Sequence, residues 1–314
     1  MSEGSKILIT GVAGFIGSNL ARRLLEAGYS VLGLDNLAHG VETQVPKGVE
    51  FHKLDIRSRD IFPVFKGVDF VFHLAAKNCI PDCEEDPVET SDINITGTTN
   101  ILEASRKAGV KKIINAESAS VYEGTGVFPT PEAEVKPRSF YAVSKFCGSL
   151  IAQKYREAYG LNVIGLRYFG VYGPRQDYRR LIPPVISAFI IKLLKREPPI
   201  IYGTGHQRKD FVYIDDINDF HLICLKEGVK NDTFNVGSGE NYSILELLDL
   251  VSSLVGIKID PIFKPALLEM DPPVNLADIS KAKKMGWRPQ TSLVDGLKEN
   301  IAYIKGEFEI GNIK

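Results

Sequence analysis

A glycine-rich turn between an apolar run and a helical stretch most constrains the fold of this chain. The run Lys6–Thr10 leads directly into Gly11-x-x-Gly14-x-x-Gly17, and a helical pattern continues through Phe15–Ala27. Glycines let the backbone approach a pyrophosphate, and the helix N-terminus supplies oriented N–H groups for it. We therefore predict a strand–turn–helix unit that binds a dinucleotide. An ordinary strand–turn–helix junction is the alternative interpretation.

Strand-like and helical segments alternate through the first half of the chain. Near-continuous apolar strands that alternate with helices are typical of a parallel sheet buried on both faces. The fold class that we predict is α/β, with a Rossmann-like doubly wound parallel sheet and a smaller mixed α/β substrate domain. The expected strands are Lys6–Thr10, Ser30–Asp35, Glu50–Asp55, Asp69–Leu74, Lys112–Ser118 and Asn162–Tyr168, and the expected helices are Phe15–Ala27, Val88–Ala108 and Phe140–Tyr159.

The alternation becomes less regular after about Tyr168. We expect a helix near Val185–Lys195, a strand near Ile200–Tyr202 and a helix near Ile244–Val255. Residues 1–168 would form the dinucleotide-binding domain, and residues 169–314 would form the substrate domain. A segment near residues 211–239 would return to the first domain.

Composition narrows the range of partners. The net charge is −1, so no feature favours nucleic acid or a membrane surface as a partner. No apolar run is long enough to span a bilayer, and the N-terminal residues lack a signal-peptide core. The four cysteines have neither a disulfide-framework spacing nor a Cys-x-x-Cys pair. We expect a cytoplasmic protein with reduced thiols and no metal site.

Tyr141 and Lys145 are the leading candidates for chemistry. They lie four residues apart in the predicted helix Phe140–Tyr159, so they share one helix face. A nearby ammonium favours the phenolate and lowers the pKa of a tyrosine toward working pH, as a general base requires. Solvated helix faces also contain this spacing by chance, but the glycine turn upstream favours catalysis.

Two strand-end carboxylates are candidates for nucleotide recognition. Asp35 ends the second predicted strand, where a carboxylate accepts both ribose hydroxyls and repels a 2′-phosphate. This position favours NAD over NADP. Asp55 ends the third predicted strand and is a candidate for the adenine amino group, with a turn residue as the alternative.

Several further motifs occur in an order that identifies a family. Together with the glycine turn, they resemble the extended short-chain dehydrogenase/reductase superfamily, in its NAD-dependent nucleotide-sugar epimerase/dehydratase branch. Within that branch the chain is most similar to UDP-glucose and UDP-N-acetylglucosamine 4-epimerases. The resemblance spans nearly the whole chain. Its motifs are His73–Ala76, Asn94–Thr98, Ser118–Tyr122, Tyr141–Lys145, Arg167–Gln176, Lys209–Asp216, Phe234–Gly239 and Ala277–Ala282.

The resemblance implies roles for the matched positions. Ser118 would hydrogen-bond the sugar O4, Tyr141 would take its proton, and Lys145 would hold the nicotinamide ribose. NAD would be bound by Gly11, Gly14, Phe15, Ile16, Gly17, Asp35, Asn36, Asp55, Ile56, Leu74, Ala75, Ala76, Asn94, Tyr141, Lys145 and Tyr168. The nucleotide sugar, with a UDP-sugar favoured, would contact Ser118, Ser120, Tyr141, Gly170, Arg175, Arg180, Leu181, Tyr202, Arg208, Lys209 and Asn275. His73 is interpreted as a hydrogen-bonded core residue.

The chain departs from the family pattern mainly where the sugar diphosphate would bind. Gly170 replaces an asparagine, and Lys209 and Leu268 each replace an arginine. Glu123 replaces a glycine after Val-Tyr. Lysine supplies a point charge where arginine supplies a bidentate fork. The diphosphate would then depend on other arginines, unless these form only a solvated basic surface; the candidates are Arg175, Arg179, Arg180 and Arg208.

The resemblance implies epimerisation at C4 through a transient 4-keto sugar, with NAD regenerated in each turnover. A 4,6-dehydratase would need an Asp-Glu pair directly after the hydroxyl residue, where this chain has Ala119-Ser120. A non-catalytic NAD-sensing protein is a second alternative, but the chain keeps both Tyr141 and Lys145.

Asn275 is small enough to leave room for an N-acetyl group at C2. In relatives, the helices that match Val88–Ala108 and Phe140–Tyr159 pair into a four-helix bundle, which implies a homodimer.

Overall fold

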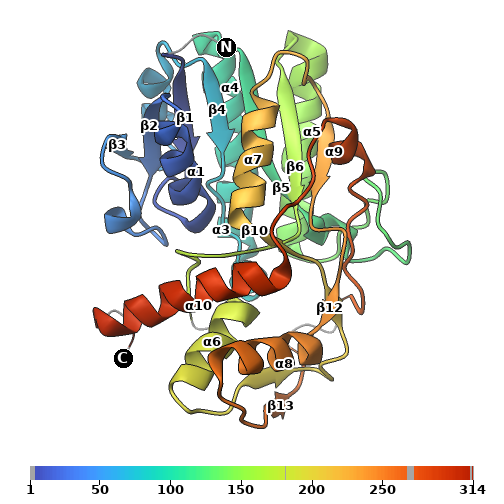
Figure 1. Cartoon of the computed structure of the whole chain (residues 1–314). Coiled ribbons are helices and arrows are strands. Elements are labelled where there is room, and N and C mark those ends of the chain that lie inside the picture. The colour runs from blue at the N-terminus through green and yellow to red at the C-terminus, as the bar shows by residue number, and fades with distance from the viewer. Residues whose placement is uncertain (1–3, 181, 267–271, 312, 314) are drawn as a thin grey trace.

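A seven-stranded sheet, parallel throughout, forms the centre of the molecule (Figure 1). The computed structural model describes residues 4–180, 182–266, 272–311 and 313. The strand order is β11-β6-β5-β4-β1-β2-β3, which is the doubly wound Rossmann order extended by one strand. The predicted fold class is confirmed. The strands are β1 (Lys6–Thr10), β2 (Ser30–Asp35), β3 (Glu50–Lys53), β4 (Phe70–His73), β5 (Lys112–Ser118), β6 (Val163–Tyr168) and β11 (Thr233–Val236).

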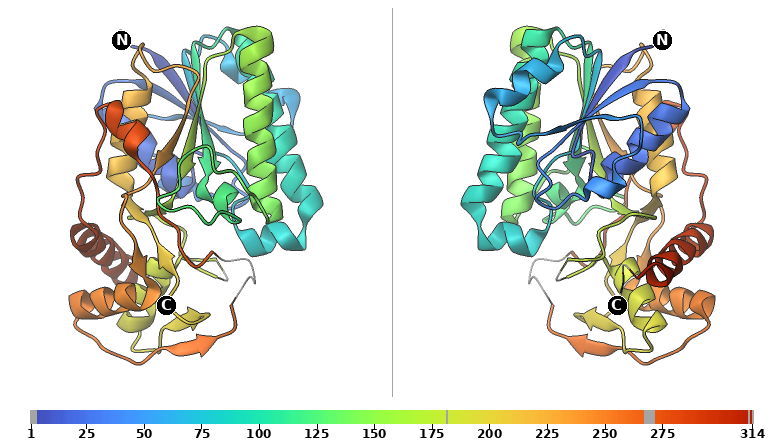
Figure 2. Two further views of the ribbon diagram at one scale, coloured as in Figure 1. Left: turned by 90° about the vertical axis from the view of Figure 1, so that its right-hand side faces the viewer. Right: turned by 90° about the vertical axis from the view of Figure 1, so that its left-hand side faces the viewer.

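Helices cover both faces of the sheet. α1 (Phe15–Glu26) and α7 (Ile214–Cys224) pack together on one face, and α4 (Thr98–Ala108) and α5 (Phe140–Tyr159) pack together on the other (Figure 2). The strands have successive side chains on opposite faces, so the sheet separates two apolar cores. In β1, for example, Ile7 and Ile9 belong to one buried cluster and Leu8 to the other.

The predicted helical stretch Val88–Ala108 is helical throughout, but it is not one regular α-helix. The chain forms α3 (Pro87–Ser91), a π-helical turn (Asp92–Gly97) and then α4. Asn94 lies in this turn, and its side chain forms hydrogen bonds with the backbone N–H and carbonyl of Lys77. π-helical turns of this kind occur frequently at functional sites.

The remaining elements form a smaller region at the carboxyl ends of the strands (Figures 1 and 2). Three two-stranded sheets lie there: β7 (Gly170–Tyr172) with β10 (Phe211–Tyr213), β9 (Arg208–Lys209) with β12 (Tyr242–Ser243), and β8 (Ile200–Tyr202) with β13 (Ile262–Lys264). The helices of this region are α6 (Val185–Leu194), α8 (Ile244–Val255) and α10 (Leu293–Glu309), whereas α9 (Ser280–Lys284) packs against β11 at the edge of the large sheet (Figure 1). The division into two domains at residue 168 remains a prediction.

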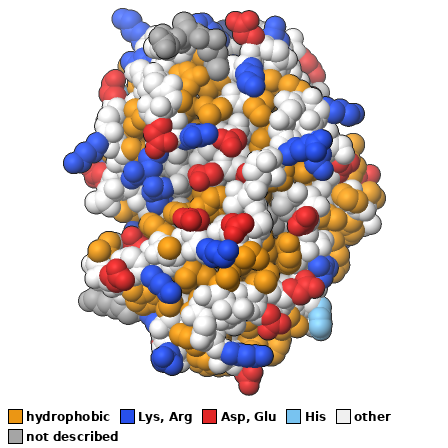
Figure 3. Space-filling model, in the orientation of Figure 1, with side chains coloured by type: hydrophobic (Ala, Val, Ile, Leu, Met, Phe, Trp, Pro, Cys, Tyr) orange, Lys and Arg blue, Asp and Glu red, His pale blue; other side chains and the backbone are white. Residues whose placement is uncertain are grey.

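Short helical segments follow four of the strands along the chain. They are η1 (Glu42–Gln44), η2 (Arg59–Phe65), α2 (Ile80–Glu85) and η4 (Ala119–Tyr122). Within the described ranges, no helix is both long and apolar enough to cross a membrane. Basic and acidic side chains are interspersed over the face shown in Figure 3, in agreement with the small net charge.

Candidate active site

The glycine turn forms a cradle that no side chain could share. Gly11 has a left-handed φ of +74°, and a Cβ atom there would lie 2.8 Å from the backbone nitrogen of Ala75. A Cβ atom on Gly17 would lie 2.1 Å from the carbonyl oxygen of Gly11. Helix α1 begins at Phe15, with Gly14 as its N-cap. The helix N-terminus and the bare backbone together suit a pyrophosphate.

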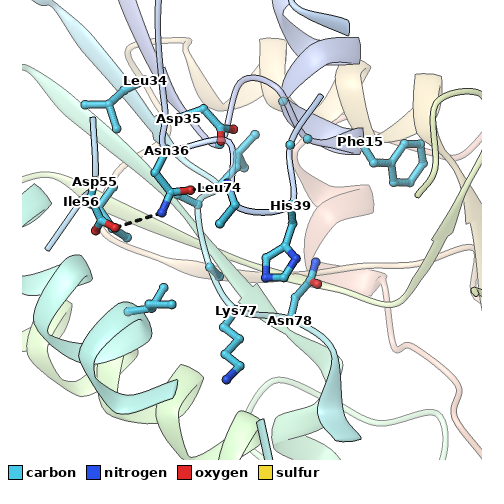
Figure 4. A pocket seen from close by; sticks show the side chains of 18 of the residues that line it. Phe15, Leu34, Asp35, Asn36, His39, Asp55, Ile56, Leu74, Lys77 and Asn78 are labelled. Carbon is cyan, nitrogen blue, oxygen red and sulfur yellow. Dashed lines mark hydrogen bonds between the residues drawn. The ribbon is translucent and has the colours of Figure 1, made fainter. Parts of the chain in front are cut away.

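One cleft collects the cofactor candidates at the carboxyl ends of β1, β2, β3 and β4 (Figure 4). All the predicted cofactor residues line it except Asn94, Tyr168, Tyr141 and Lys145. Sequence analysis missed further lining residues, of which Lys77 and Asn78 directly extend the Leu74-Ala75-Ala76 motif. The other missed residues are Leu34, Ala38, His39, Gly40, Leu54, Arg57, Glu89, Ile93 and Asp177, and Arg180, a predicted substrate residue, also lines the cleft.

Asp35 lies at the end of β2 with both carboxylate oxygens in use. Oδ2 accepts a hydrogen bond from the backbone N–H of Ala13 at 3.0 Å, and Oδ1 accepts one from Leu37 at 2.8 Å. Burial raises the pKa of Asp35 above its usual value, and these two bonds oppose that effect. Each oxygen keeps a second lone pair for a ribose hydroxyl. Asp35 is therefore placed and oriented for the role that its position in the sequence predicts.

Asp55 is less available than its position in the sequence suggested. β3 ends at Lys53, so Asp55 lies two residues beyond the strand rather than at its end. Its carboxylate pairs with Arg57 at 2.8 Å and accepts a hydrogen bond from Asn36 Nδ2 at 2.9 Å. The paired guanidinium lowers the pKa of Asp55 to about 2. The residue lines the cleft while it anchors its own loop.

Replacement of Asp35 by alanine should weaken the preference for NAD over NADP. A carboxylate close to a 2′-phosphate in wet surroundings costs about 1 kcal/mol, so the ratio of the two affinities should change roughly fivefold. The dissociation constants of both cofactors, measured by calorimetry, check this result. Asp55→Ala is the matched control and should leave the ratio unchanged. Equal binding of NAD and NADP by the unaltered protein would contradict the assignment of Asp35.

Asn94 and Tyr168 are two of the four predicted cofactor residues that do not line the cleft. Asn94 is buried, and its side chain accepts a hydrogen bond from the Lys77 N–H and donates one to the Lys77 carbonyl, both at 2.9 Å. It fixes the loop that lines the cleft rather than lining the cleft itself. The Tyr168 hydroxyl is buried against Nε2 of His221 at 2.6 Å. Tyr168 is therefore a core residue in this structure.

Ser118, Tyr141 and Lys145 are brought together by β5 and α5. Ser118 ends β5, and its Oγ accepts a hydrogen bond from the Ser120 N–H at 3.1 Å. Tyr141 is the second residue of α5, and its phenol lies close enough to Ser118 for the two hydroxyls to interact. Lys145, one helical turn further on, is only 7% exposed. Three groups that can move or hold a proton thus meet at the carboxyl edge of the sheet.

The pKa values of these groups differ from the simple expectation. Burial raises the pKa of Tyr141 to about 12, although the hydrogen bond with Ser118 opposes the shift. Burial also lowers the pKa of Lys145 to about 8. The expected lowering of the tyrosine pKa by Lys145 is therefore not present in the protein alone. The reason is that both side chains leave water, and desolvation disfavours the charged form of each.

A second cavity lies beside the cofactor cleft and shares Asn78 and Arg180 with it. Among the predicted substrate residues, Arg180, Tyr202 and Lys209 line this cavity. Most of its wall is apolar, with a few polar groups, which is typical of a small-molecule site. The other lining residues are Cys79, Ile80, Pro81, Ile182, Pro184, Val185, Ile200, Ile201, Gly203, Thr204, His206, Gln207, Ile244, Ala266 and Pro273.

Several substrate candidates lie elsewhere. Arg208 points away from the second cavity, where it pairs with Glu246 at 3.1 Å and donates to Asn241. Arg175 and Arg179 line a separate cavity together with Arg22. Asn275 does not line the second cavity, and its backbone N–H donates to the Arg208 carbonyl at 2.9 Å. Leu181 and Leu268 lie outside the described residues.

The structure explains why residue 170 is glycine. Parallel pairing of β7 with β10 sets Gly170 opposite Phe211. A Cβ atom at position 170 would lie 2.7 Å from the Asp210 carbonyl oxygen. The asparagine that the family pattern has here would therefore require the two strands to move apart. Any contact with the sugar nucleotide at this point must come from another residue.

His73 and the four cysteines complete the set of candidate side chains. His73 is buried, with Nδ1 2.8 Å from Thr10 Oγ1 and Nε2 3.0 Å from Thr98 Oγ1, so it is a hydrogen-bonded core residue. All four cysteines are free thiols. Over the described ranges, no group of three or more His, Cys, Asp or Glu side chains could hold a metal ion.

The glycine cradle, the strand-end carboxylate and the Ser-Tyr-Lys group define a Rossmann-type dinucleotide-dependent enzyme. Residues 7–237 match the NAD dependent epimerase/dehydratase family, and the chain belongs to this family. NAD is accordingly its cofactor.

Relatives match nearly the full length of the chain. A Methanocaldococcus jannaschii protein, provisionally a UDP-glucose 4-epimerase, is 39% identical over 95% of this chain and 98% of its own. The structure of Thermotoga maritima UDP-glucose 4-epimerase with UDP-glucose is 34% identical, covers 96% of this chain and 99% of its own, and superposes with a TM-score of 0.93. The structure of UDP-N-acetylglucosamine 4-epimerase from Methanobrevibacter ruminantium, bound to UDP-N-acetylmuramic acid, is 30% identical to this chain. It covers 98% of this chain and 100% of its own, and it superposes with a TM-score of 0.93.

Proposed function

We propose that this protein interconverts the C4 epimers of a UDP-sugar, either UDP-glucose and UDP-galactose or the N-acetylated pair. The observation that carries the proposal is the meeting of Ser118, Tyr141 and Lys145 on β5 and α5, the sheet edge that also carries the dinucleotide cleft. The sugar-nucleotide enzymes that the chain resembles along nearly its full length are 4-epimerases.

The chain's own residues supply the proton transfers. Tyr141 takes the proton of the sugar O4, and Ser118 holds that oxygen by a hydrogen bond. Lys145 stabilises the phenolate that must form first. When bound, NAD supplies a reversible hydride acceptor for C4. The 4-keto sugar rotates within the site, so that its opposite face is presented for return of the hydride to C4. Tyr141 then gives the proton back to O4.

A 4,6-dehydratase is not supported by the residues beside Ser118. Ala119 and Ser120 follow it, where that reaction needs an acid and a base. Glu117 precedes it, but its carboxylate is buried in a pair with Arg167 at 2.9 Å, on the opposite side of the strand. No carboxylate from these positions reaches the sugar.

A panel of UDP-, dTDP-, GDP- and CDP-sugars, read by NMR, tests the reaction and identifies the substrate. The expected product is the C4 epimer of a UDP-sugar. In it H4 has changed between the axial and the equatorial position, which changes its coupling constants to H3 and H5. The panel also decides between plain and N-acetylated hexoses, for which the position of Asn275 gives no support. A 4-keto-6-deoxy product would instead establish the dehydratase.

The outward face of the helix pair supports a homodimer as a second part of the proposal. Large apolar side chains are exposed along it, among them Leu150 on α5, which is 49% exposed. Phe140 and Val143 are exposed on the same side of α5, and Val88 is exposed on α3. Burial of such a face against its own copy across a two-fold axis gives an isologous interface.

Light scattering at micromolar concentration should therefore give twice the 34.7 kDa of the chain. Leu150→Glu places a charge in the interface and should give a monomer. Ile262→Glu is the matched control, because Ile262 is equally exposed but lies on β13 in the smaller region. A monomeric unaltered protein would contradict the proposal.

A cytoplasmic location completes the proposal. All four thiols are free, and free thiols persist best in a reducing compartment. Fractionation of cells with an antibody to the chain tests it, with recovery in the membrane or secreted fraction as the contrary result.

A further inference from the structure

Glu123 occupies a position where relatives have glycine, and its side chain is 8% exposed. The carboxylate accepts three hydrogen bonds from the segment that leads into α5. The donors are the backbone N–H of Ser139 at 2.8 Å, the backbone N–H of Arg138 at 3.1 Å and the hydroxyl of Ser139 at 2.9 Å. A buried carboxylate needs such compensation, so the side chain is held in one place.

The hydrogen bonds of Glu123 connect the two chain segments that carry Ser118 and Tyr141. Ser139 is the N-cap of α5, and its Oγ accepts the Ala142 N–H at 3.1 Å, which fixes the turn that contains Tyr141. On the other side, Glu123 directly follows η4, the short helix that Ser118 caps. The carboxylate therefore joins the segment that begins with Ser118 to the helix end that carries Tyr141.

We propose that Glu123 is a positioning residue for the C4 epimerisation, which fixes Tyr141 relative to Ser118 and holds a negative charge beside the phenol. The proposal rests on the proposed function, with Tyr141 as the base. A glycine at position 123 could supply neither the tether nor the charge.

The groups that face Tyr141 show which way the charge acts. Apart from burial, Cys83 of α2 and Glu123 raise the pKa of Tyr141, while Ser118 and Arg180 lower it. Glu84 also reaches the start of α5, where it accepts the Phe140 N–H at 2.6 Å, but it is not among these groups. Removal of the charge at Glu123 should therefore ease ionisation of Tyr141.

Two substitutions separate the charge from the tether. Glu123→Gln keeps the tether, because its carbonyl can accept both backbone N–H groups and its amide can donate to the Ser139 hydroxyl. Glu123→Asp keeps the charge but is one methylene too short to reach all three donors. Glu84→Gln is the matched control at the same helix end. The measurement is the pH dependence of kcat and KM for the UDP-sugar identified by the panel.

With Tyr141 as the base, kcat rises with pH as the phenol loses its proton. In Glu123→Gln this rise should move to lower pH by on the order of half a unit, with KM unchanged. In Glu123→Asp the rise should stay in place while kcat falls by about tenfold or more, because small misplacements of a reacting group are costly. Glu84→Gln should leave the pH profile in place.

An unmoved profile in Glu123→Gln overturns the role of the charge, and a normal kcat in Glu123→Asp overturns the tether. If Glu123→Gln fails to fold, the aspartate variant still decides the positioning role. Tyr141→Phe is assayed in parallel. Near-normal turnover there would refute the proposed base, whereas lost turnover with both Glu123 variants normal would refute only the inference about Glu123.

Discussion

Tyr141→Phe should lower kcat by roughly 10²–10⁴-fold, the range typical of a lost general acid–base. The change removes one oxygen and leaves the half-buried ring in its place on α5. Because the glycine cradle and Asp35 bind the cofactor from other elements, NAD content should be unchanged. The variant should therefore be a folded, cofactor-loaded protein that does not turn over.

Steady-state kinetics with the preferred UDP-sugar, alongside the absorbance of released cofactor, measure both quantities. Tyr159→Phe is a suitable control, because Tyr159 ends the same helix with an exposed ring. It should behave as the unaltered protein. Epimerisation by Tyr141→Phe at a near-normal rate would remove Tyr141 from the mechanism and leave Ser118 or Lys145 to be tested as the base.

The elements predicted from sequence correspond closely to the structure where burial alone decides them. β1, β2 and β5 have the predicted limits, since strands buried on both faces read as short apolar runs. The limits of α5 also agree, because Ser139 caps its start and Gly160 ends it in a left-handed conformation. The segment 88–108 is helical as predicted, but its apolar pattern does not reveal the π-helical turn within it.

The cofactor cleft was predictable because its residues follow parallel strands, whose carboxyl ends share one edge of the sheet. The orientation of Tyr168 was not predictable, because its hydroxyl turns into the core toward His221. Arg208 adjoins Lys209 in a strand, and neighbouring strand residues point to opposite sides. Lys209 thus faces the second cavity while Arg208 faces Glu246.

The location of Arg180 could not be predicted, since it depends on how the chain crosses between the two regions. Arg180 lines both the cofactor cleft and the second cavity. Its Nε is buried and, over the described ranges, makes no hydrogen bond. Its nearest carboxylate is Asp177, at 3.8 Å, and Asn78 Oδ1 lies 3.4 Å from Nη1. A guanidinium with such weak partners is suited to bind an anion between the two cavities.

Arg180→Ala should therefore raise KM for the UDP-sugar by roughly ten- to a hundredfold. A hydrogen bond to a charged group contributes about 1.5–3 kcal/mol, and 1.4 kcal/mol is about tenfold in affinity. The same substitution removes a positive charge that lowers the pKa of Tyr141, so the rise of kcat with pH should move to higher pH. Lys209→Ala should raise KM less, because an ammonium is a point charge without the bidentate fork.

The matched control is Arg179→Ala, since Arg179 precedes Arg180 in the chain but lines the cavity of Arg22 and Arg175. It should leave KM unchanged. Arg175→Ala and Arg208→Ala complete the series, with NAD content measured in each variant to exclude loss of cofactor. A rise in KM limited to Arg180 and Lys209 would show that the diphosphate is held between the two cavities. If no variant changes KM by more than about twofold, these arginines do not replace the family's usual diphosphate-binding residues. The diphosphate is then not the main anchor of the ligand.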